Sequence, residues 1–512
     1  LREISEFYLK ADVDGMKEIV EKVITIFADS FGVNVLAYCT ISSMAKALWV
    51  DGNEWKHLVF LPENESQYNV FRSAVYGGRV DVVKPRYQSR GLDLDALLSL
   101  CDLETAGDRT VIKGHGLKFT DFEWNSVREF DYTSLYVSVM HQFSFPIGEC
   151  LTAPDEFIFL LNRGKDLSFL SPDERAHREK ILGYQGIYYI KFIPNKWLTI
   201  PTLPRREADS TLSWTLEPGE GFYTAEDIAM ALETHYEIEY YSGVYWEQSE
   251  KIFQSWMVKT YEVKDEGEKE GNEAKRACGK LSGNGTYGGT LQKDHDDVYK
   301  MSYCVEDYIS FMSKYEMTGA SFFGGDTVGL AGKEAVMERK SPIHLGAFVL
   351  SFSRKLMFIE FKKLNPVITI HPSTMTETLL KDSMEHTFFY TDTDSMWANS
   401  NYTQRFDRLG EELGFLKDES MKMKKLKPDA LAKLSEDALK AEPSRYFLTK
   451  DKNGEMSWKE RVGPVVLARW NPGNKEYCNI YIKPNNEVSI SIKRKGITTS
   501  LMKLEYYIKV FS

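Results

Sequence analysis

The sequence predicts a mixed fold of helices and antiparallel strands, because segments of both periodicities occur along the chain. Apolar residues at helical spacing run through residues 6–27 and 346–361, and a second helical stretch with small residues follows the first. Strand-like runs occupy residues 187–193 and 388–397, and the latter run is typical of a buried β-hairpin. We therefore expect an α+β protein in which helices pack on sheets.

Length and composition indicate a globular protein. The chain has 512 residues, of which 43% are apolar, and this is enough for several subdomains. No run of about 18 uncharged apolar residues marks a membrane span, and the first residues lack a secretory apolar region. Six widely spaced cysteines without a C-x-x-C pair are typical of a reducing compartment. We expect an intracellular protein without a membrane partner.

The charge balance limits where this chain could contact a polyanion. The formal net charge is −11, whereas phosphate contacts come from Lys and Arg. Basic residues are concentrated in two places, at residues 422–427 and 493–495. Each cluster is either a phosphate-binding patch or solvated surface. The acidic run at residues 265–270 is expected to form an exposed turn.

Two carboxylates interrupt the apolar run 388–397. Asp392 and Asp394 stand two residues apart among aromatic neighbours. Burying an unpaired carboxylate costs several kcal/mol, so the pair indicates a site for a divalent cation. The alternative is an Asp-Thr-Asp turn at the tip of a solvent-facing hairpin.

Two further segments favour a cation site that acts on phosphate. A short apolar run ends at Asp131, and an aspartate at the end of a strand is a natural metal ligand. One helix face is shared by four residues at i, i+4, i+8 and i+11, namely Arg276, Lys280, Asn284 and Tyr287. Cations on such a face suit a triphosphate. The alternative is an ordinary solvated face.

Three segments together resemble the polymerase motifs of the family B DNA polymerases, and in particular of their protein-primed branch from bacteriophages, adenovirus-like viruses and linear plasmids. The motifs of that family read D-x-x-S-L-Y-P, K-x-x-x-N-S-x-Y-G and Y-x-D-T-D-S. Residues 131–137, 280–288 and 390–395 read DYTSLYV, KLSGNGTYG and YTDTDS, in the same order. Three correlated motifs are far more specific than any one of them.

Three shorter segments extend the resemblance over nearly the whole chain. Residues 475–477 read KEY and look like the K-x-Y motif that steadies the primer end. Residues 75–79 read VYGGR and are similar to the template-contacting Y-x-G-G segment, with the tyrosine one place later. Tyr8 and Asp12 look like the Y-x-x-x-D of the third exonuclease motif.

The resemblance implies a right-hand polymerase with a palm of antiparallel sheet plus helices, helical fingers and a small thumb, preceded by the remnant C-terminal part of an exonuclease domain. The implied divisions are the exonuclease remnant at 1–65, the first part of the palm with the template-contact linker at 66–150, an insertion that is the candidate priming-protein-binding region at 151–250, the fingers at 251–290, a second insertion with a candidate strand-displacement hairpin at 291–343, the second part of the palm at 344–440 and the thumb at 441–512. No residues precede Leu1 to supply the earlier exonuclease strand, so we expect a front portion that is absent or separately made.

The resemblance also implies a role for each motif residue. Asp131 and Asp394 would bridge the metals, Asp392 would support them, and the backbone carbonyl of Tyr132 would complete one coordination shell. The implied nucleotide-binding residues are Ser134, Leu135, Tyr136, Arg276, Lys280, Asn284 and Tyr287. The implied DNA-binding residues are Gly77, Gly78, Ser395, Lys475, Tyr477 and Lys493. The tyrosine rings under the sugar would leave no room for a 2′-hydroxyl, although both rings could instead be core aromatics.

The implied reaction is the addition of a deoxynucleotide to a primer 3′-hydroxyl or to a priming-protein hydroxyl, with release of pyrophosphate. Hard cations with oxygen ligands suit such a reaction, so we expect two Mg²⁺ ions, with Mn²⁺ as a possible substitute. The expected partners are DNA template and primer, deoxynucleoside triphosphates and a possible terminal protein.

Several features depart from the pattern or imitate a motif. Val137 replaces the proline of the first motif and Gly285 the serine of the second. Each interior glycine of the second motif costs a helix about 0.5–1 kcal/mol relative to alanine, so we expect that helix to be shorter or more mobile. The D-x-E-T of residues 102–105 is out of order for an exonuclease motif, and we interpret it as a helix end. We interpret the acidic and histidine cluster at 294–297 as a surface loop.

Two other functions remain open at this point. A polymerase-derived nucleic-acid-binding or structural subunit without activity would explain the acidic charge and the glycines. Asp131 and Asp394 count against it, because such a relic need not keep paired charges that destabilise a site without metal. An RNA polymerase or reverse transcriptase is weaker still, since Tyr136 would exclude ribonucleotides and the third motif is not a pair of adjacent aspartates.

Overall fold

The computed structural model describes residues 2–54, 56–84, 86–89, 92, 103–106, 109–112, 118–119, 127–163, 170–293, 297–325, 327–334, 341–385, 388–399, 405–426, 431, 433–435, 445–450, 456–470 and 476–494. The predicted DNA contact Lys475 lies outside these residues. For Tyr8, Asp12, Tyr477 and Lys493 the structure describes the backbone but not the side chain.

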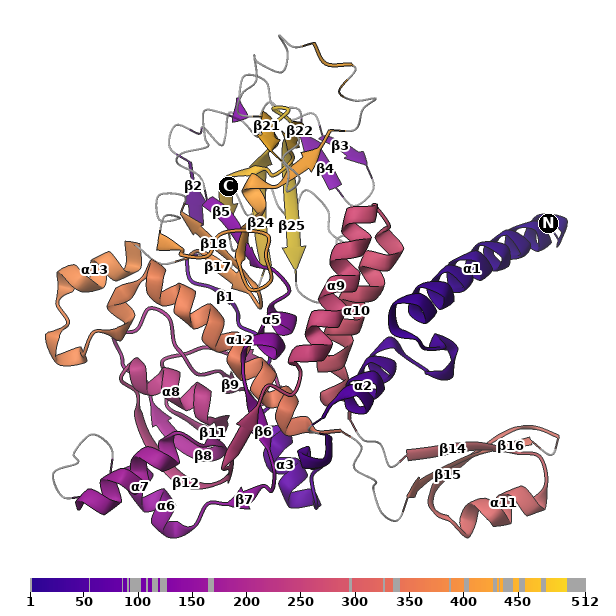
Figure 1. The fold of residues 1–512 in the computed structure, drawn as a ribbon, viewed down its shortest axis with the longest axis horizontal. Coiled ribbons are helices and arrows are strands. Elements are labelled where there is room, and N and C mark those ends of the chain that lie inside the picture. Colours follow the sequence, from indigo (N-terminus) through magenta and orange to yellow (C-terminus); the bar gives the residue numbers. More distant parts are fainter. Residues whose placement is uncertain are drawn as a thin grey trace.

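A large antiparallel sheet joins strands from distant parts of the chain (Figure 1). Its 11 strands run in the order β1-β17-β18-β5-β23-β24-β25-β4-β3, with β19 also paired to β5 and β2 to β23. Their bounds are β1 Val80–Val82, β2 Arg86–Gln88, β3 Leu103–Ala106, β4 Arg109–Ile112, β5 Val127–Tyr132, β17 Tyr390–Asp392, β18 Ser395–Asn399, β19 Leu416–Asp418, β23 Val465–Trp470, β24 Glu476–Ile482 and β25 Val488–Arg494. Strands of the predicted palm and of the predicted thumb share this sheet, because Val466 pairs with Val127.

Smaller antiparallel sheets surround the large one. The strands β11, β8, β12 and β7 form one, β14, β16 and β15 a second, and β20, β22 and β21 a third, while β9 with β10 and β6 with β13 form two-stranded ribbons. Their bounds are β6 Phe145–Ile147, β7 Leu151–Thr152, β8 Gln185–Ile193, β9 Arg205–Arg206, β10 Leu212–Ser213, β11 Gly219–Thr224, β12 Glu237–Trp246, β13 Gln248–Glu250, β14 Asp297–Ser302, β15 Tyr315–Gly324, β16 Thr327–Glu334, β20 Met423–Lys425, β21 Tyr446–Lys450 and β22 Met456–Arg461.

The helices include long ones that cross the molecule and short ones that connect strands. Their bounds are α1 Arg2–Phe31, α2 Ile41–Gly52, α3 Glu65–Ser73, α5 Leu135–Gln142, α6 Asp155–Asn162, α7 Pro172–Leu182, α8 Ala225–Glu233, α9 Gln254–Glu270, α10 Glu273–Thr290, α11 Val305–Met312, α12 Ile343–Leu364 and α13 Glu377–Glu385. Short 3-10 turns lie at Val35–Ala37, Lys56–Leu58, Pro366–Thr369, Pro372–Thr374 and Glu419–Met421. The prediction of an α+β fold with antiparallel sheets and packed helices is confirmed.

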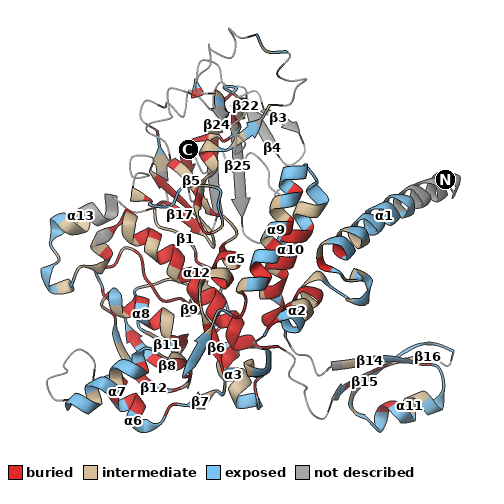
Figure 2. Cartoon of the chain, in the orientation of Figure 1, coloured by how far each residue is buried: buried red, intermediate tan, exposed pale blue. Residues whose placement is uncertain are grey.

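Helix α12 forms the spine of the hydrophobic core. It is buried along nearly its whole length, as the red ribbon in Figure 2 shows. It packs against α5, α8 and α3, and the ring of Phe352 contacts those of Phe143, directly after α5, and Phe145 of β6. Since apolar residues occupy all faces of the helix, the sequence reads as a fully buried helix rather than an amphipathic one. The predicted helix at 346–361 is confirmed and is longer than expected.

Helices α9 and α10 form an antiparallel hairpin at the position of the predicted fingers. The hairpin turns at Gly271, whose φ of 67° is left-handed and is easily reached only by a glycine. Asn272 then caps α10 by accepting a hydrogen bond from the N–H of Lys275. The reversal therefore uses a glycine stop and an asparagine start, both of which are visible in the sequence.

The glycines of α10 allow two neighbouring helices to approach it closely. A Cβ at Gly279 would stand 2.5 Å from the backbone N of Lys264 on α9, and one at Gly289 would stand 3.0 Å from the backbone O of Ser42 on α2. Helix α10 is continuous over 18 residues. The expectation of a helix that is shorter or more mobile than in related proteins stays a prediction, and the close packing that glycine permits gives these residues a structural role.

The N-terminal region begins with the helix α1, which extends away from the body in Figure 1. The predicted helix at 6–27 is confirmed, and its last turns reach the core, where Phe31 packs against Trp256 of α9. The second predicted helical stretch corresponds to α2, which Thr40 caps in a reciprocal capping box with Ser43. Among the described residues, no helix has both the length and the apolar character needed to cross a membrane.

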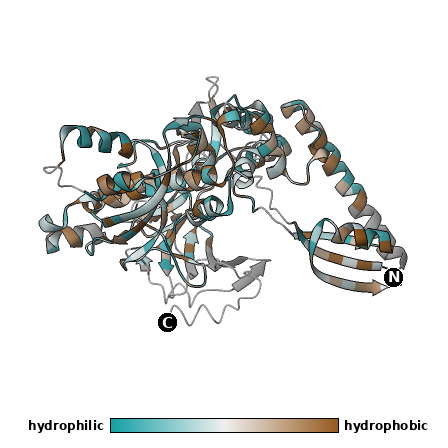
Figure 3. Ribbon diagram, turned by 90° about the horizontal axis from the view of Figure 1, so that it is seen from below, coloured by the Kyte–Doolittle hydropathy of each residue, from teal (hydrophilic) through white to brown (hydrophobic). Residues whose placement is uncertain are grey.

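Each of the two predicted insertions contains a small antiparallel sheet. In the first, β8 pairs with both β11 and β12, while α6, α7 and α8 pack around the sheet. In the second, α11 covers one face of the sheet β14-β16-β15, so that Phe311 and Leu330 are buried. This second unit stands apart from the body in Figure 1, and apolar bands mark its strands in Figure 3. The domain divisions themselves remain predictions.

Two glycine-to-alanine variants should have opposite effects on stability. Gly279→Ala should lower the free energy of unfolding by about 1–3 kcal/mol, because its methyl group would collide with the backbone of α9. Gly15→Ala should raise it by about 0.5–1 kcal/mol, because this helical glycine of α1 has no atom near its Cβ position. Urea denaturation of both variants measures the difference. Equal effects of the two substitutions would contradict the packing argument.

Candidate active site

The structure brings Asp131 and Asp394 together from distant parts of the chain. Strand β18 runs antiparallel to β5 in a register that places Ser395 opposite Asp131. The backbone N–H of Tyr132 donates to the carbonyl oxygen of Asp394 at 2.8 Å, which fixes the end of β5 against the turn between β17 and β18. The two predicted metal ligands therefore lie at the same corner of the large sheet.

The environment of this corner disfavours negative charge. Burial, together with the charges of Asp394, Glu419 and Glu129, raises the pKa of Asp131 to about 7. Burial also raises the pKa of Asp394, to which the charge of Asp392 adds. Lys280 opposes both shifts. Carboxylates held in this way gain most from a cation that neutralises them.

Asp392 has its own hydrogen-bond partners at the end of β17. The hydroxyl of Tyr390 donates to its Oδ2 at 3.2 Å, and that of Thr393 donates to its Oδ1 at 3.3 Å. Thr393 has a φ of 60°, so the turn between the two strands is tight and left-handed. Beneath the turn, the guanidinium of Arg469 lies over the ring of Tyr390 at 4.3 Å and is fully buried.

The Tyr-Gly-Gly segment lies directly against the Asp-Thr-Asp turn. Its continuation, β1, pairs with β17 so that Val80 stands opposite Asp392. The N–H of Thr393 donates to the carbonyl of Arg79 at 2.8 Å. A Cβ at Gly78 would stand 2.6 Å from Cγ2 of Thr393, so only glycine fits there. Gly78 and Asp394 are therefore neighbours in space, and the predicted contact of Gly77 and Gly78 with DNA remains a prediction.

Helix α5 begins at the same corner and presents the first motif. Ser134 precedes it with a φ of 55°, while Leu135 is buried in the core. The ring of Tyr136 stacks on that of Tyr287 from α10, with ring centroids 4.4 Å apart. Burial raises the pKa of Tyr136, and the charge of Asp394 adds to the shift. The two tyrosines of the first and second motifs are thus brought together beside a carboxylate.

Cations of α9 and α10 face the carboxylates. Lys280 is exposed, and its charge reaches both Asp131 and Asp394. Arg276 is 39% exposed and forms ion pairs with Glu273 at 3.2 Å and with Glu268 at 3.9 Å. Asn284 and Tyr287 are half-buried further along the same helix. The four residues of the predicted face lie on one helix. Among them, Lys280 is the residue whose charge lowers the pKa of both Asp131 and Asp394.

Two functional candidates were missed by the sequence motifs. Lys264 of α9 donates to the hydroxyl of Ser134 at 3.1 Å, and burial lowers its pKa, to which the charges of Arg276 and Lys280 contribute. Glu419 follows β19, whose residue Lys417 pairs opposite Asp131. Pairing the two predicted helices across their turn would have placed Lys264 opposite Gly279 of the second motif, so the sequence offers a signal for this residue. No sequence signal marks Glu419, since only the return of β19 brings it to the site.

A cleft opens beside Asp131, between the large sheet and the segment after β22. It holds about 450 Å³ and is lined by polar and apolar groups. Its lining residues are Glu129, Asp131, Trp397, Glu419, Ser420, Lys422, Val462, Gly463, Pro464, Val466 and Tyr481. Its acidic corner adjoins Lys422, which forms an ion pair with Glu419 at 3.0 Å. This cleft is large enough to admit a nucleotide-sized group.

The remaining predicted residues lie further along the sheet or outside the described side chains. Tyr477 and Lys493 stand opposite each other in the ladder of β24 and β25. Ser395 opens β18, and its hydroxyl donates to the carbonyl of Asp392 at 3.3 Å. Glu104 lies in β3, which pairs with β4 at the opposite end of the strand order from β17, so the interpretation of this segment as a helix end was wrong. Residues 102 and 294–296 lie outside the described residues.

The donor set at this corner fits magnesium better than zinc. The described residues contain no group of three or more His, Cys, Asp or Glu arranged to hold a metal ion. Magnesium usually takes one or two carboxylates and completes its shell with water and substrate phosphates. Asp131 and Asp394 provide two such oxygen donors with raised pKa values. The carbonyl of Tyr132 remains a predicted ligand.

A protein-family model identifies the class of protein to which this chain belongs. The model of the family described as DNA polymerase type B, organellar and viral, matches residues 2–91 and 121–320, which is more than half of the chain. The chain belongs to this family. No curated protein sequence matches it.

Solved structures of Phi29 DNA polymerase share the fold. The complex with primer-template DNA and incoming nucleotide gives a TM-score of 0.51 at 15% identity, covering 92% of this chain and 63% of that chain. An orthorhombic crystal form gives 0.51 at 15% identity, with 94% and 64% covered. The complex with single-stranded DNA gives 0.50 at 14% identity, with 91% and 62% covered. The chain spans less than two thirds of the length of this polymerase.

The raised pKa of Asp131 predicts that the free energy of unfolding of the metal-free protein decreases as the pH rises. As pH increases, the unfolded chain loses this proton near pH 4 and the folded protein only near pH 7, so the folded state is penalised progressively across that interval. In the presence of a chelator, Asp131→Asn should raise the free energy of unfolding by about 1–3 kcal/mol at pH 8. The gain should grow from pH 5 to pH 7 and then level off.

Chemical denaturation of the wild type and the variant between pH 5 and pH 8 measures this gain. Asp14→Asn, at an exposed position of α1, serves as the control and should follow the wild type. A constant difference between Asp131→Asn and the wild type over this range would argue against a buried, charge-repelled Asp131.

Proposed function

We propose that this chain catalyses template-directed DNA synthesis with deoxynucleoside triphosphates and a primer as substrates. The primer 3′-hydroxyl oxygen forms a bond to the α-phosphorus, the bond to the β-phosphate oxygen breaks, and pyrophosphate leaves. The observation that carries the proposal is the meeting of Asp131 and Asp394 at one corner of the sheet, opposite Lys280. Membership of the type B polymerase family supports it.

The carboxylates of Asp131 and Asp394 would hold two magnesium ions, which supply charge neutralisation for the entering and leaving oxygens when bound. Tyr390 and Thr393 keep the carboxylate of Asp392 oriented through the hydrogen bonds of their hydroxyls. Glu419 adds negative charge on the side of the cleft. The carboxylate corner therefore remains attractive to cations even when one group is protonated.

The cations of α9 and α10 would bind the triphosphate. Lys280 contributes a point charge from the exposed side of α10, and Lys264 contributes a second from α9. Arg276 would exchange its exposed ion pairs with glutamates for the phosphates, which costs little because exposed pairs are weak. The stacked rings of Tyr136 and Tyr287 would form the floor under the sugar and disfavour a 2′-hydroxyl.

A priming protein is a further partner that we propose for this chain. The supporting observation is the sheet β11-β8-β12-β7 within residues 151–250, which carries a cavity of about 600 Å³ at the ends of its strands. Acidic residues Glu220, Glu237 and Glu239 line this cavity. A basic segment of a priming protein would be complementary to them.

Magnesium-dependent primer extension tests the reaction. Asp394→Asn should lower the rate of nucleotide addition by roughly 1,000-fold or more, because one of the two carboxylates that attract the metal becomes neutral. Asp407→Asn, which removes a surface carboxylate paired with Lys363, should leave the rate unchanged. Full activity of Asp394→Asn would reject the metal site. An inactive wild type that still binds primer-template would favour a non-enzymatic binding subunit.

Lys264 should act on the incoming nucleotide. Lys264→Ala should raise the KM for the deoxynucleotide by roughly 10- to 100-fold while the Kd for primer-template stays the same, because a charged hydrogen bond to phosphate is lost. Lys259→Ala, an exposed lysine on the same helix, is the matched control and should resemble the wild type. Steady-state kinetics with varied nucleotide provide the measurement, and an unchanged KM in Lys264→Ala would remove this residue from the site.

A further inference from the structure

A buried ion pair joins the first insertion to the spine of the core. Arg354 of α12 donates to Asp227 of α8 through Nε at 2.9 Å and through Nη2 at 2.7 Å. The side chains are 5% and 0% exposed. Asp227 also accepts from the hydroxyl of Thr224 at 3.0 Å, and that hydroxyl lies 2.5 Å from the hydroxyl of Ser351 on α12. The carboxylate is therefore held on both sides.

The remaining nitrogen of Arg354 contacts the Tyr-Gly-Gly segment. Its Nη1 donates to the carbonyl oxygen of Tyr76 and, at 3.2 Å, to that of Gly77. The guanidinium thus links three stretches of chain that are far apart in the sequence: α8, α12 and residues 76–77. Because the guanidinium is planar and its donors have fixed directions, it fixes the carbonyls in orientation as well as in distance.

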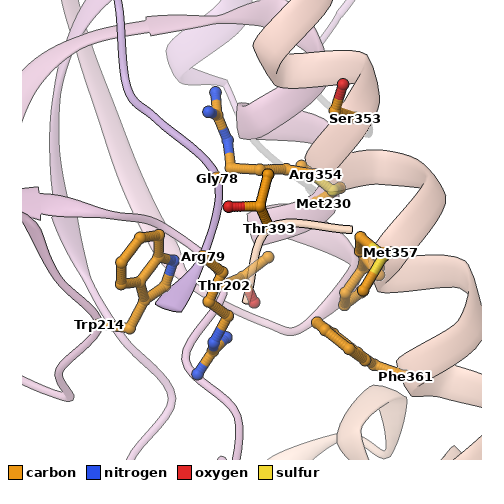
Figure 4. Close-up of a pocket in the computed structure, with 11 residues that line it drawn as sticks. Gly78, Arg79, Thr202, Trp214, Met230, Ser353, Arg354, Met357, Phe361 and Thr393 are labelled. Carbon is orange, nitrogen blue, oxygen red and sulfur yellow. The ribbon is translucent and has the colours of Figure 1, made fainter. Parts of the chain in front are cut away.

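The segment held by Arg354 leads directly to the catalytic turn. Gly78 follows Gly77 and lies in contact with the side chain of Thr393. The carbonyl of Arg79 accepts the hydrogen bond from the N–H of Thr393. Arg354, Gly78 and Thr393 line the same cavity, which Figure 4 shows from inside. A shift of residues 76–79 would therefore move the turn that carries Asp392 and Asp394.

Stability alone does not account for this arrangement. Replacing a buried ion pair by apolar groups of similar volume is often neutral or stabilising, because both charges lose their water. What the pair provides is direction, since the two carboxylate oxygens fix the plane of the guanidinium. A guanidinium with a fixed plane can hold the carbonyl groups of Tyr76 and Gly77 in a fixed orientation.

We propose that Asp227 is a positioning residue for the catalytic turn. It orients the guanidinium of Arg354, which holds the carbonyls of Tyr76 and Gly77 and thereby places Thr393 between Asp392 and Asp394. The catalytic consequence rests on the proposed polymerase function, whereas the structural coupling does not. The first insertion then supports the active site in addition to any partner that it binds.

The neighbouring ion pair provides a matched control. Lys355 and Glu226 join the same two helices at 2.6 Å, one residue away from Arg354 and Asp227 on each helix. Both side chains are partly exposed, and the hydrogen bond between them does not involve residues 76–79. Glu226→Gln therefore weakens the contact between α8 and α12 without releasing the segment that leads to the turn.

Hydrogen–deuterium exchange and primer extension on the full chain test the proposal. In Asp227→Asn, the peptide containing the Thr393 amide should exchange roughly tenfold faster or more, because its acceptor at Arg79 is no longer held in place. The kcat for nucleotide addition should fall by roughly 10- to 100-fold, with the Kd for primer-template unchanged. Glu226→Gln should match the wild type in both measurements.

Arg354→Lys keeps the charge of the pair but lacks the planar fork, and it should show the same two changes. It also provides the test if Asp227→Asn does not fold, as judged by circular dichroism. Unchanged exchange and kcat in either folded variant would overturn the proposal, as would equal changes in Glu226→Gln. Failure of the proposed function is recognised separately, by an active Asp394→Asn or an inactive wild type, and the exchange measurement stands in both cases.

Discussion

The pairing of β18 with β5 is the constraint on which the rest of the site depends. Its register places Ser395 opposite Asp131, so Asp394 in the adjoining turn reaches the same corner of the sheet. Burial raises the pKa of both carboxyl groups, to which the charge of Asp394 adds at Asp131 and the charge of Asp392 at Asp394. Among the neighbouring elements, α10 contributes the cation Lys280 and β1 a backbone contact, while Glu419 and Glu129 add negative charge.

Contacts between backbones hold the turn against its neighbouring strands. The turn between β17 and β18 is bonded to β5 through Tyr132 and to the end of β1 through Arg79. Gly78 permits this approach because any side chain there would collide with Thr393. These backbone hydrogen bonds fix the positions of the chain segments that carry the carboxylates.

Charge is distributed unevenly over the molecule, which reconciles a net charge of −11 with the proposed substrate. Lys264 and Lys280 from the helix hairpin face the carboxylate corner, while acidic residues gather at sites such as the cavity of the first insertion. Because charges are screened beyond about 8–10 Å in physiological salt, the local field near the site matters more than the total. The packing of α10 between α9 and α2 keeps these cations in place.

The sequence by itself determined the secondary structure around the motifs and the identity of the principal carboxylates. The order of Asp131, Lys280 and Asp394, the hairpin at 388–397 and the helix at 346–361 could be predicted because their signals are local: alternation, helical spacing and short motifs. The sequence located the glycine-rich helix but did not explain its glycines. Their role is visible only in the structure, where they allow the backbones of α9 and α2 to approach closely.

The tertiary structure alone decided which remote groups share the site. Glu419 and the pair of Asp227 with Arg354 have no sequence signal, because each is brought in by an element that returns from elsewhere in the chain. Contacts between elements depend on strand register and helix packing, which are set by the whole core at once. For that reason the motifs identify the reacting groups, and only the fold shows what positions them.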